Sequence, residues 1–221
     1  MNTKEKLKSV AEEQFFKYGY NQVSGRGLCE IAGISRSRLK YYFDDKESLA
    51  SEIIRDSFKK LHYKLIATKP FEEGDLLKSN LQYMSVLLMC ITDILSKNES
   101  PSAFYNECMN AGVVAPVLTE YVNNSMSIIN KEMKEHYDKA HILTYAKIFV
   151  NAFSTNAKKY RDVYANEGSS NFLGEIYSDL YMKLLDVPKE VRTEIVAYAK
   201  KQKQRITVKY NSMYDIEIKY F

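Results

Sequence analysis

Residues that begin and end helices alternate at short intervals through the first fifty positions, and their spacing restricts the fold more than any other feature of the chain. Apolar residues recur at helical spacing over Thr3–Tyr18 and Gly19 follows them, so a helix is predicted there. Ser24 is a good N-cap for a short second helix that ends at Gly33. Ser35 is a good N-cap for a third helix. The spacing therefore predicts three short helices that follow one another closely.

The second and third predicted helices form a helix-turn-helix. Gly33 supplies the left-handed residue after the second helix, and Ile34 fills the angle between the two helices. The third helix runs to about Phe43, and Leu39, four positions earlier, faces the core with it. The open face then carries Arg36, Ser37, Arg38, Lys40 and Tyr41.

This open face is basic and aromatic, and no acidic residue occurs between Ile31 and Phe43. A helix fits the major groove of DNA, where Arg donates two hydrogen bonds to guanine O6 and N7. Lys and Tyr bind phosphates, which position a helix without reading the base sequence. The face therefore predicts binding to double-stranded DNA, with a merely solvated helix face as the alternative.

The rest of the chain is predicted to be mostly helical, because Gly (8) and Pro (4) are scarce. Asp44 or Asp45 caps a fourth helix that ends before Pro70. Further helices are expected at 74–96, 102–111, 116–137, 142–166, 171–185 and 188–204, with breaks at SKNESPS and EGSS. The last residues alternate apolar and polar, which predicts a β-hairpin at 205–220 with its turn at Asn211-Ser212. A lone hairpin is marginal in water, so it should pack on the body or on a partner subunit.

The first fifty residues resemble the tetracycline-repressor (TetR) family of bacterial regulators. The matching pieces are Phe15-Phe16, Gly19-Tyr20, Ser24, Ile31–Ser35, Leu39, Tyr41–Phe43 and Lys46–Leu49. The resemblance implies an all-α homodimer in which a second domain binds a small molecule, and usually the repression of transcription. It also implies DNA contacts by Ser24 and Lys46, beside those of the open face.

The chain departs from the family pattern at three places. Gly25 and Gly27 occupy the first turn of the second helix, where each costs about 1 kcal/mol of helix stability. Lys40 stands where the family usually has Tyr, and Arg38 stands where a small hydroxyl residue is common. The resemblance therefore does not carry the operator sequence over to this chain.

The expected architecture is a helix-turn-helix domain at 1–45 followed by a connecting, ligand-binding and dimerisation domain at 46–221. A family-like dimer would use the helices at 142–166 and 171–185. Their faces offer Ile148, Ala152, Thr155, Tyr177, Leu180 and Leu184. The candidates for lining an effector pocket are Tyr83, Leu87, Phe104, Tyr105, Tyr121 and Phe153, and for each of them a place in the core is the alternative.

Charge is unevenly distributed along the chain. Residues 1–62 hold 12 basic and 9 acidic side chains, a net charge of +3; residues 63–187 hold 12 and 15, a net −3; and residues 188–221 hold 8 and 4, a net +4. A basic front suits a polyanion such as DNA, and the acidic middle gives an anionic ligand no advantage. The expected effector is therefore neutral or cationic and largely apolar.

Several classes of protein are disfavoured by the sequence. The start of the chain is charged and unlike a signal peptide, and the longest apolar stretch contains Asp93 and is too short to span a bilayer, so a cytoplasmic protein is expected. Cys29, Cys90 and Cys108 form no C-x-x-C motif and read as buried small hydrophobes rather than redox sensors. His136 and His141 are five apart, which is the wrong spacing for a helical metal pair.

No catalytic signature and no cofactor motif is present, so the chain is not expected to be an enzyme. Two readings compete with a repressor released from its operator by a small molecule. One is a DNA-binding regulator without such an effector, controlled by a protein partner or constitutive. The other is an enzyme that carries a helix-turn-helix head.

Overall fold

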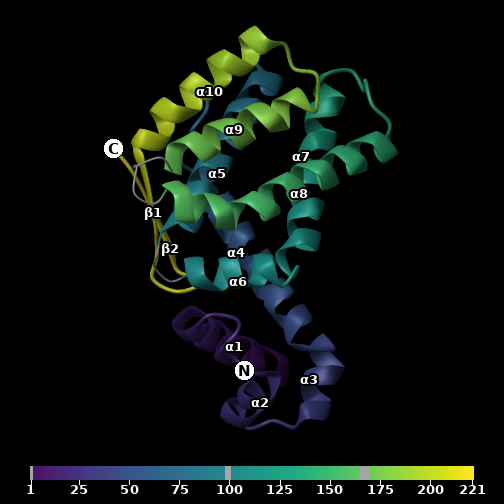
Figure 1. Ribbon diagram of the computed structural model, residues 1–221, viewed down its shortest axis with the longest axis vertical. Helices are drawn as coiled ribbons and strands as arrows, with labels where there is room; N and C mark the ends of the chain where they lie inside the picture. The colour runs from purple at the N-terminus through teal and green to yellow at the C-terminus, as the bar shows by residue number, and fades with distance from the viewer. Residues whose placement is uncertain (1, 98–100, 165–169) are drawn as a thin grey trace. The chain divides into compact units, whose positions relative to one another are not determined.

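The computed structural model describes residues 2–97, 101–164 and 170–221, and its side chains are described outside 156–171. Over these residues the fold is all-α with one small sheet, as predicted (Figure 1). The described elements are α1 (Thr3–Tyr18), α2 (Gly25–Ala32), α3 (Arg36–Phe43), α4 (Lys46–Ile66), α5 (Leu76–Ser96), α6 (Ser102–Asn110), α7 (Val114–Glu132), α8 (Lys139–Tyr164), α9 (Ser170–Lys183), α10 (Lys189–Gln204), β1 (Ile206–Tyr210) and β2 (Ile216–Tyr220).

The chain divides into two compact units. The first, which we call the head unit, comprises Met1–Leu61, Asn98–Val117 and Lys209–Glu217. The second, the body unit, comprises His62–Lys97, Leu118–Val208 and Ile218–Phe221. The head unit is larger than the three-helix domain expected at 1–45, because most of α4, all of α6 and the middle of the hairpin group with it. A functional boundary at residue 45 stays a prediction.

The helix ends predicted for the head are present, but the Ser35 side chain, at the N-cap position of α3, makes no capping hydrogen bond. Gly19 ends α1 at φ 77°, and Gly33 ends α2 in the left-handed conformation at φ 62°. The Ser24 hydroxyl accepts a hydrogen bond from the Gly27 N–H at 3.0 Å, which caps α2. Of the two aspartates, Asp45 caps α4 by accepting from the Ser48 N–H at 2.7 Å, and Asp44 ends α3 at φ 62°. Because these signals are local, the predicted helix limits are confirmed.

The body unit is built on the packing of α5 against α9 and α10 (Figure 1). Gly174 lets α9 approach α5 closely, because a Cβ at this position would lie 2.8 Å from the Met89 Cα. One turn later, the Ser178 hydroxyl donates within its own helix to the Gly174 carbonyl at 2.7 Å, so this buried hydroxyl is satisfied. Small residues on α9 thus set the spacing of the two helices.

The predicted limits of α7 are wrong at both ends. The helix begins at Val114, since Pro116 is tolerated within a first helical turn, where it removes no intrahelical bond. It ends at Glu132 rather than at about Tyr137, because the Asn130 side chain bonds both to the N–H of Tyr137, at 3.0 Å, and to its carbonyl, at 2.8 Å. This side chain closes a loop that a continued helix would not allow.

The predicted end of α8 at residue 166 lies outside the described residues. The same is true of most residues in the two predicted breaks, SKNESPS and EGSS.

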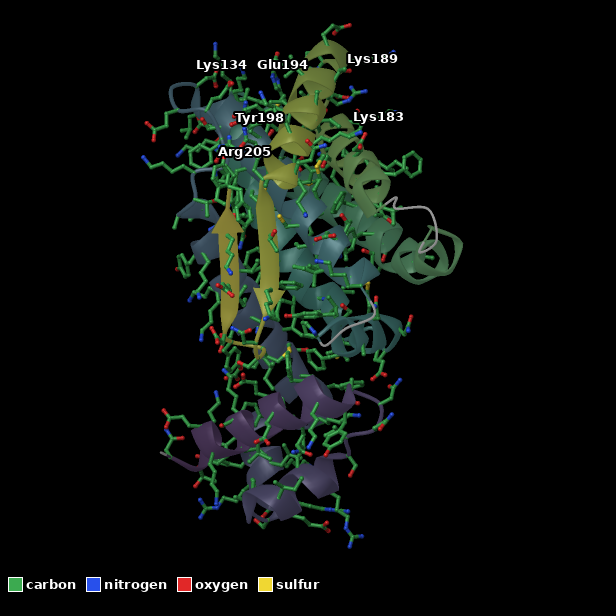
Figure 2. All side chains as sticks on the ribbon, turned by 90° about the vertical axis from the view of Figure 1, so that its left-hand side faces the viewer. Lys134, Lys183, Lys189, Glu194, Tyr198 and Arg205 are labelled. Carbon is green, nitrogen blue, oxygen red and sulfur yellow. The ribbon has the colours of Figure 1, made fainter. Side chains whose placement is uncertain are left out.

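The predicted C-terminal hairpin is confirmed, with a longer connection. Alternate residues of β1 are buried, as a half-buried strand requires. The strands are joined by residues 211–215 rather than by a two-residue turn. At the other end of the hairpin, the Arg205 Nε donates to the Phe221 backbone oxygen at 2.7 Å, and its guanidinium lies 4.4 Å from the centre of the Tyr220 ring. Figure 2 shows Arg205 where α10 gives way to β1.

Candidate nucleic-acid interface

The exposed face of α3 is the strongest candidate for a functional surface. Arg36, Ser37, Arg38 and Lys40 are exposed, and Tyr41 is exposed to 81%. Leu39 and Phe43 are buried on the opposite side, so all of these side chains lie on the sides of the helix that the sequence predicted.

The turn between α2 and α3 brings the two helices close together. A Cβ on Gly25 would lie 3.3 Å from the Leu39 Cδ2. This contact gives the unusual glycine in the first turn of α2 a packing role, since a larger residue would require the Leu39 side chain to shift. The Gly27 N–H, two residues later, provides the donor for the Ser24 cap.

The cationic groups of α3 are available to a ligand. Over the described residues Arg36, Arg38 and Lys40 take part in no ion pair, whereas Arg26 on α2 bonds to Glu30 at 2.7 Å. The Tyr41 and Tyr42 rings meet edge to face, with centroids 5.0 Å apart. The face therefore presents three cations with open hydrogen-bond donors beside an exposed phenol.

Ser24 and Lys46, the two residues added by the resemblance, have structural partners. Ser24 is exposed, and its hydroxyl accepts the capping bond, which leaves the hydroxyl hydrogen for another acceptor. The Lys46 ammonium donates to the carbonyls of Tyr20 at 3.2 Å and Val23 at 3.1 Å. It also lies 3.7 Å from the centre of the Tyr20 ring. Lys46 thus holds the loop between α1 and α2, with one of its three ammonium hydrogens left for a phosphate.

Ion pairs join α1 to α4 within the head unit. The Lys8 ammonium bonds to Glu52 at 2.9 Å and to Asp56, and Lys4 bonds to Glu52 at 3.1 Å. Burial would raise the pKa of Glu52, but the hydrogen bonds from Lys8 and Lys4 hold that pKa below its usual value. Burial alone would lower the pKa of Lys8, but the hydrogen bonds to Asp56 and Glu52 outweigh burial and raise that pKa above its usual value. These charges were not identified from the sequence, because their pairing depends on how two helices meet.

Helix α6 supports the head from another side. The Glu107 carboxylate accepts a hydrogen bond from the Asn21 N–H at 2.7 Å and lies against Gly19, where a Cβ would be 2.7 Å from its Oε2. The Phe104 ring stacks on Phe15 of α1 at 5.1 Å. The positive φ at position 19 favours glycine, and a Cβ there would also displace the Glu107 carboxylate.

The six candidates for an effector pocket fall into separate groups. Phe104 and Tyr105 are each 1% exposed and belong to the core of the head unit. In the body unit, Tyr83 and Tyr121 lie at His62, with ring centroids 5.3 and 6.4 Å from the imidazole. The remaining two are buried in the body unit: Leu87 on α5, one turn after Tyr83, and Phe153 against Phe149 and Tyr177.

The dimer candidates lie largely on the surfaces of α8 and α9. Ile148 and Thr155 are exposed, and Ala152, Leu180 and Leu184 are partly exposed. Tyr177 is only 3% exposed, so it belongs to the core and offers no surface to a partner. It lies about 100° around the helix from the exposed Ile176, which the sequence analysis missed. Leu143 and Phe172 are further exposed apolar residues of these two helices.

The remaining chemistry of the described residues is sparse. The three cysteines are buried and unpaired, and burial raises the pKa of the Cys90 thiol to about 12, which keeps it protonated at neutral pH. Within the described ranges, no three His, Cys, Asp or Glu side chains are grouped so as to hold a metal ion. Nor does any helix there have the length and apolar character needed to cross a membrane.

The three-helix head, the left-handed turn at Gly33 and the exposed basic face of α3 define a helix-turn-helix protein. Residues 8–53 match the family described as bacterial regulatory proteins, tetR family. The head of this chain is therefore that of a TetR-family transcriptional regulator, which confirms the resemblance seen in the sequence.

Among characterised relatives, the chain is similar to the HTH-type transcriptional regulator QacR of Staphylococcus aureus, with 39% identity over 54 residues. This match covers 24% of the chain and 29% of that protein's length, so it concerns the head alone. Two solved structures are similar over a longer span. One is the TetR regulator TylP of Streptomyces fradiae, at 14% identity and a TM-score of 0.44, covering 89% of this chain and 97% of that one. The other is a gamma-butyrolactone receptor (ArpA-like protein), at 15% identity and a TM-score of 0.46, covering 91% and 96%.

Proposed function

We propose that this protein is a transcriptional regulator that binds an operator as a homodimer, with α3 of each subunit in the major groove, and that it acts as a repressor. The observation that carries this proposal is the exposed face of α3, on which Arg36, Arg38 and Lys40 keep open donors within the described structure. Two such helices must lie one turn of DNA apart, about 34 Å, to read successive major grooves. A change in the spacing of the heads would therefore release the operator.

The proposed signal for release is a small, largely apolar molecule bound by the body unit. Support comes from the aromatic group at His62, where the imidazole Nδ1 and the Tyr83 hydroxyl are 2.6 Å apart. Burial lowers the pKa of His62, so the imidazole is neutral at neutral pH and its Nδ1 can accept the Tyr83 hydrogen. Phe71 and Tyr121 add further ring faces. Rings with a few polar tips suit a neutral or cationic apolar molecule. Such a ligand shifts the equilibrium by no more than its differential affinity for the two states.

In-vitro selection of DNA bound by the full chain tests the first part of the proposal. We expect an inverted repeat whose half-sites are separated by about one helical turn. Enrichment of no sequence above background would contradict it. The Arg36→Ala/Arg38→Ala variant is the control, because it removes two open donors of α3 and should abolish enrichment while the protein stays folded.

Release of the selected operator tests the effector. Hydrophobic cations, neutral aromatic compounds and fatty acids are added separately to the complex, and the DNA-bound fraction is measured by fluorescence anisotropy. We expect the first two classes to release DNA and Tyr83→Ala to reduce the effect. Release by fatty acids alone would make the charge argument wrong. No release by any class, together with no small molecule retained in native mass spectrometry, would favour a regulator controlled by a protein partner or constitutive.

A further inference from the structure

The loop that joins the two strands of the hairpin is internally ordered. We call residues 211–215 the hairpin tip. The Asn211 N–H donates to the Asp215 carbonyl at 2.8 Å. The Ser212 hydroxyl accepts from the N–H groups of Tyr214, at 3.2 Å, and Asp215, at 3.1 Å. Because its own hydrogen bonds hold its shape, the tip can transmit a displacement rather than absorb it.

A buried chain of hydrogen bonds anchors the tip in the head unit. The Ser57 hydroxyl of α4 donates to the Met213 carbonyl at 2.7 Å. Having used its hydrogen there, Ser57 accepts from the Tyr105 hydroxyl of α6, whose oxygen lies at 2.6 Å. Ser57, Met213 and Tyr105 are each no more than 1% exposed. Breaking such a chain leaves buried polar groups unpaired, so the anchor is specific in its geometry.

The tip also contacts α1 and α4 at the place where ion pairs join them. The Ser212 hydroxyl donates to Glu12 of α1 at 3.0 Å. The Lys60 ammonium of α4 donates to the Tyr214 carbonyl at 3.3 Å and lies 4.7 Å from the centre of its ring. Lys8, which is paired with Glu52 and Asp56, lies 5.9 Å from the same ring. The Tyr214 ring thus lies beside the ammonium groups of both Lys8 and Lys60.

We propose that the hairpin tip is a positioning element for the helix-turn-helix, an inference that rests on the proposed DNA-binding function. Helix α1 packs on α2, and α2 packs on α3. An element that fixes α1 against α4 therefore also fixes the direction in which α3 meets DNA. Ser212, Met213 and Tyr214 hold this arrangement without touching DNA themselves. The outer residues of both strands belong to the body unit, where Arg205 holds the open end of the hairpin.

The test compares the full-length Ser212→Ala/Tyr214→Ala variant with Tyr214→Phe. The double change removes the bond to Glu12, the two bonds that the Ser212 hydroxyl accepts within the tip, and the ring over Lys8 and Lys60. The Tyr214 hydroxyl is buried and has no hydrogen-bond partner among the described residues, so Tyr214→Phe keeps the tip's contacts. Dissociation constants are measured on the selected operator and on operators with one base pair added or removed between the half-sites. Melting temperatures are measured in parallel.

We expect the double variant to bind the selected operator about five- to tenfold more weakly, because a smaller fraction of heads is in the competent geometry. Its discrimination between the three spacings should shrink, while Tyr214→Phe behaves as the wild type. Unchanged affinity and spacing preference in a folded double variant would overturn the inference and leave the proposed function standing. Equal weakening on all three spacings would also overturn it, since a tip that only stabilises the head does not select spacing. A wild-type protein that selects no DNA would overturn the proposed function together with the inference.

Discussion

Arg38 and Lys40 lie two residues apart on the exposed face of α3 and are expected to make different contacts. If Arg38 reads a base, Arg38→Ala costs about 1–3 kcal/mol on the preferred operator and relaxes the preference at one position. If Lys40 binds a phosphate, Lys40→Ala weakens binding to all sequences similarly and lowers the salt dependence by about one unit. Anisotropy titrations on operator variants at several salt concentrations measure both effects. Equal loss of sequence preference in the two variants would contradict this division.

At the level of single residues, the sequence predicted those features whose cause is local. Gly33 and Ser24 end and begin helices through bonds to neighbours within a few positions, so their roles could be read directly. Glu107 could not be identified in this way, because its partners Gly19 and Asn21 are more than eighty positions away in the chain. Nor could the burial of Tyr177 be predicted. Neighbouring positions on a helix point about 100° apart, so an error of one position is enough to exchange the buried Tyr177 with the exposed Ile176.

The crossing of α5 and α9 reverses the usual effect of a glycine-to-alanine change. In a helix interior, alanine is favoured over glycine by about 1 kcal/mol. At Gly174 the new methyl group would lie 2.8 Å from the Met89 Cα and 2.9 Å from the Thr92 Oγ1. Overpacking of this kind costs about 1–3 kcal/mol, so Gly174→Ala is expected to lower the midpoint of urea unfolding.

Gly27→Ala is the contrasting variant for this test. There the added methyl meets only the Ser24 hydroxyl, at 3.2 Å, and no backbone. Its change in stability should stay within about 1 kcal/mol, the size of the propensity difference itself. A Gly174→Ala protein at least as stable as the wild type would show that α9 can move away from α5 at little cost.

The ion pairs between α1 and α4 make the head sensitive to acid. The pKa of Glu52 in the folded protein lies below its ordinary value of 4.5, because bonds from Lys8 and Lys4 outweigh the effect of burial. A depressed pKa contributes stability that is present above the unfolded value and is lost as the pH falls through the folded value. Stability should therefore decline below about pH 4.5, and less steeply in Glu52→Gln, which cannot titrate there.

Urea unfolding between pH 3 and pH 7 measures this difference in slope. Glu132→Gln, on the exposed surface of α7, serves as the matched control and should follow the wild type. Identical slopes for the wild type and Glu52→Gln would mean that these ion pairs contribute nothing to stability, as is common for exposed pairs.

Elements were predicted well where one stretch of chain decides them, and poorly where distant stretches meet. The hairpin follows from its alternating residues, yet its partners α1 and α4 lie some 150 to 200 positions earlier. Phe104 and Tyr105 have the composition of pocket residues, and only the docking of α6 on Phe15 and Ser57 shows that they support the head. The end of α7 depends on a single Asn130 side chain, which helix periodicity does not reveal.

At the scale of the whole molecule, reading an inverted repeat requires a dimer, and the exposed apolar residues of α8 and α9 are its expected interface. Ile148 is 47% exposed and Ile176 is 40% exposed. In a two-fold interface each substitution is introduced twice, so Ile148→Glu/Ile176→Glu would bury four unpaired carboxylates. We expect the wild type to be a dimer at micromolar concentration in analytical ultracentrifugation, and the variant to be a folded monomer that binds the operator at least about 100-fold more weakly, a loss of about 2.7 kcal/mol. Val191→Glu, at an exposed apolar position of α10, should remain a dimer. A wild type that stays monomeric would contradict the proposed assembly, and a dimeric double variant would move the interface away from α8 and α9.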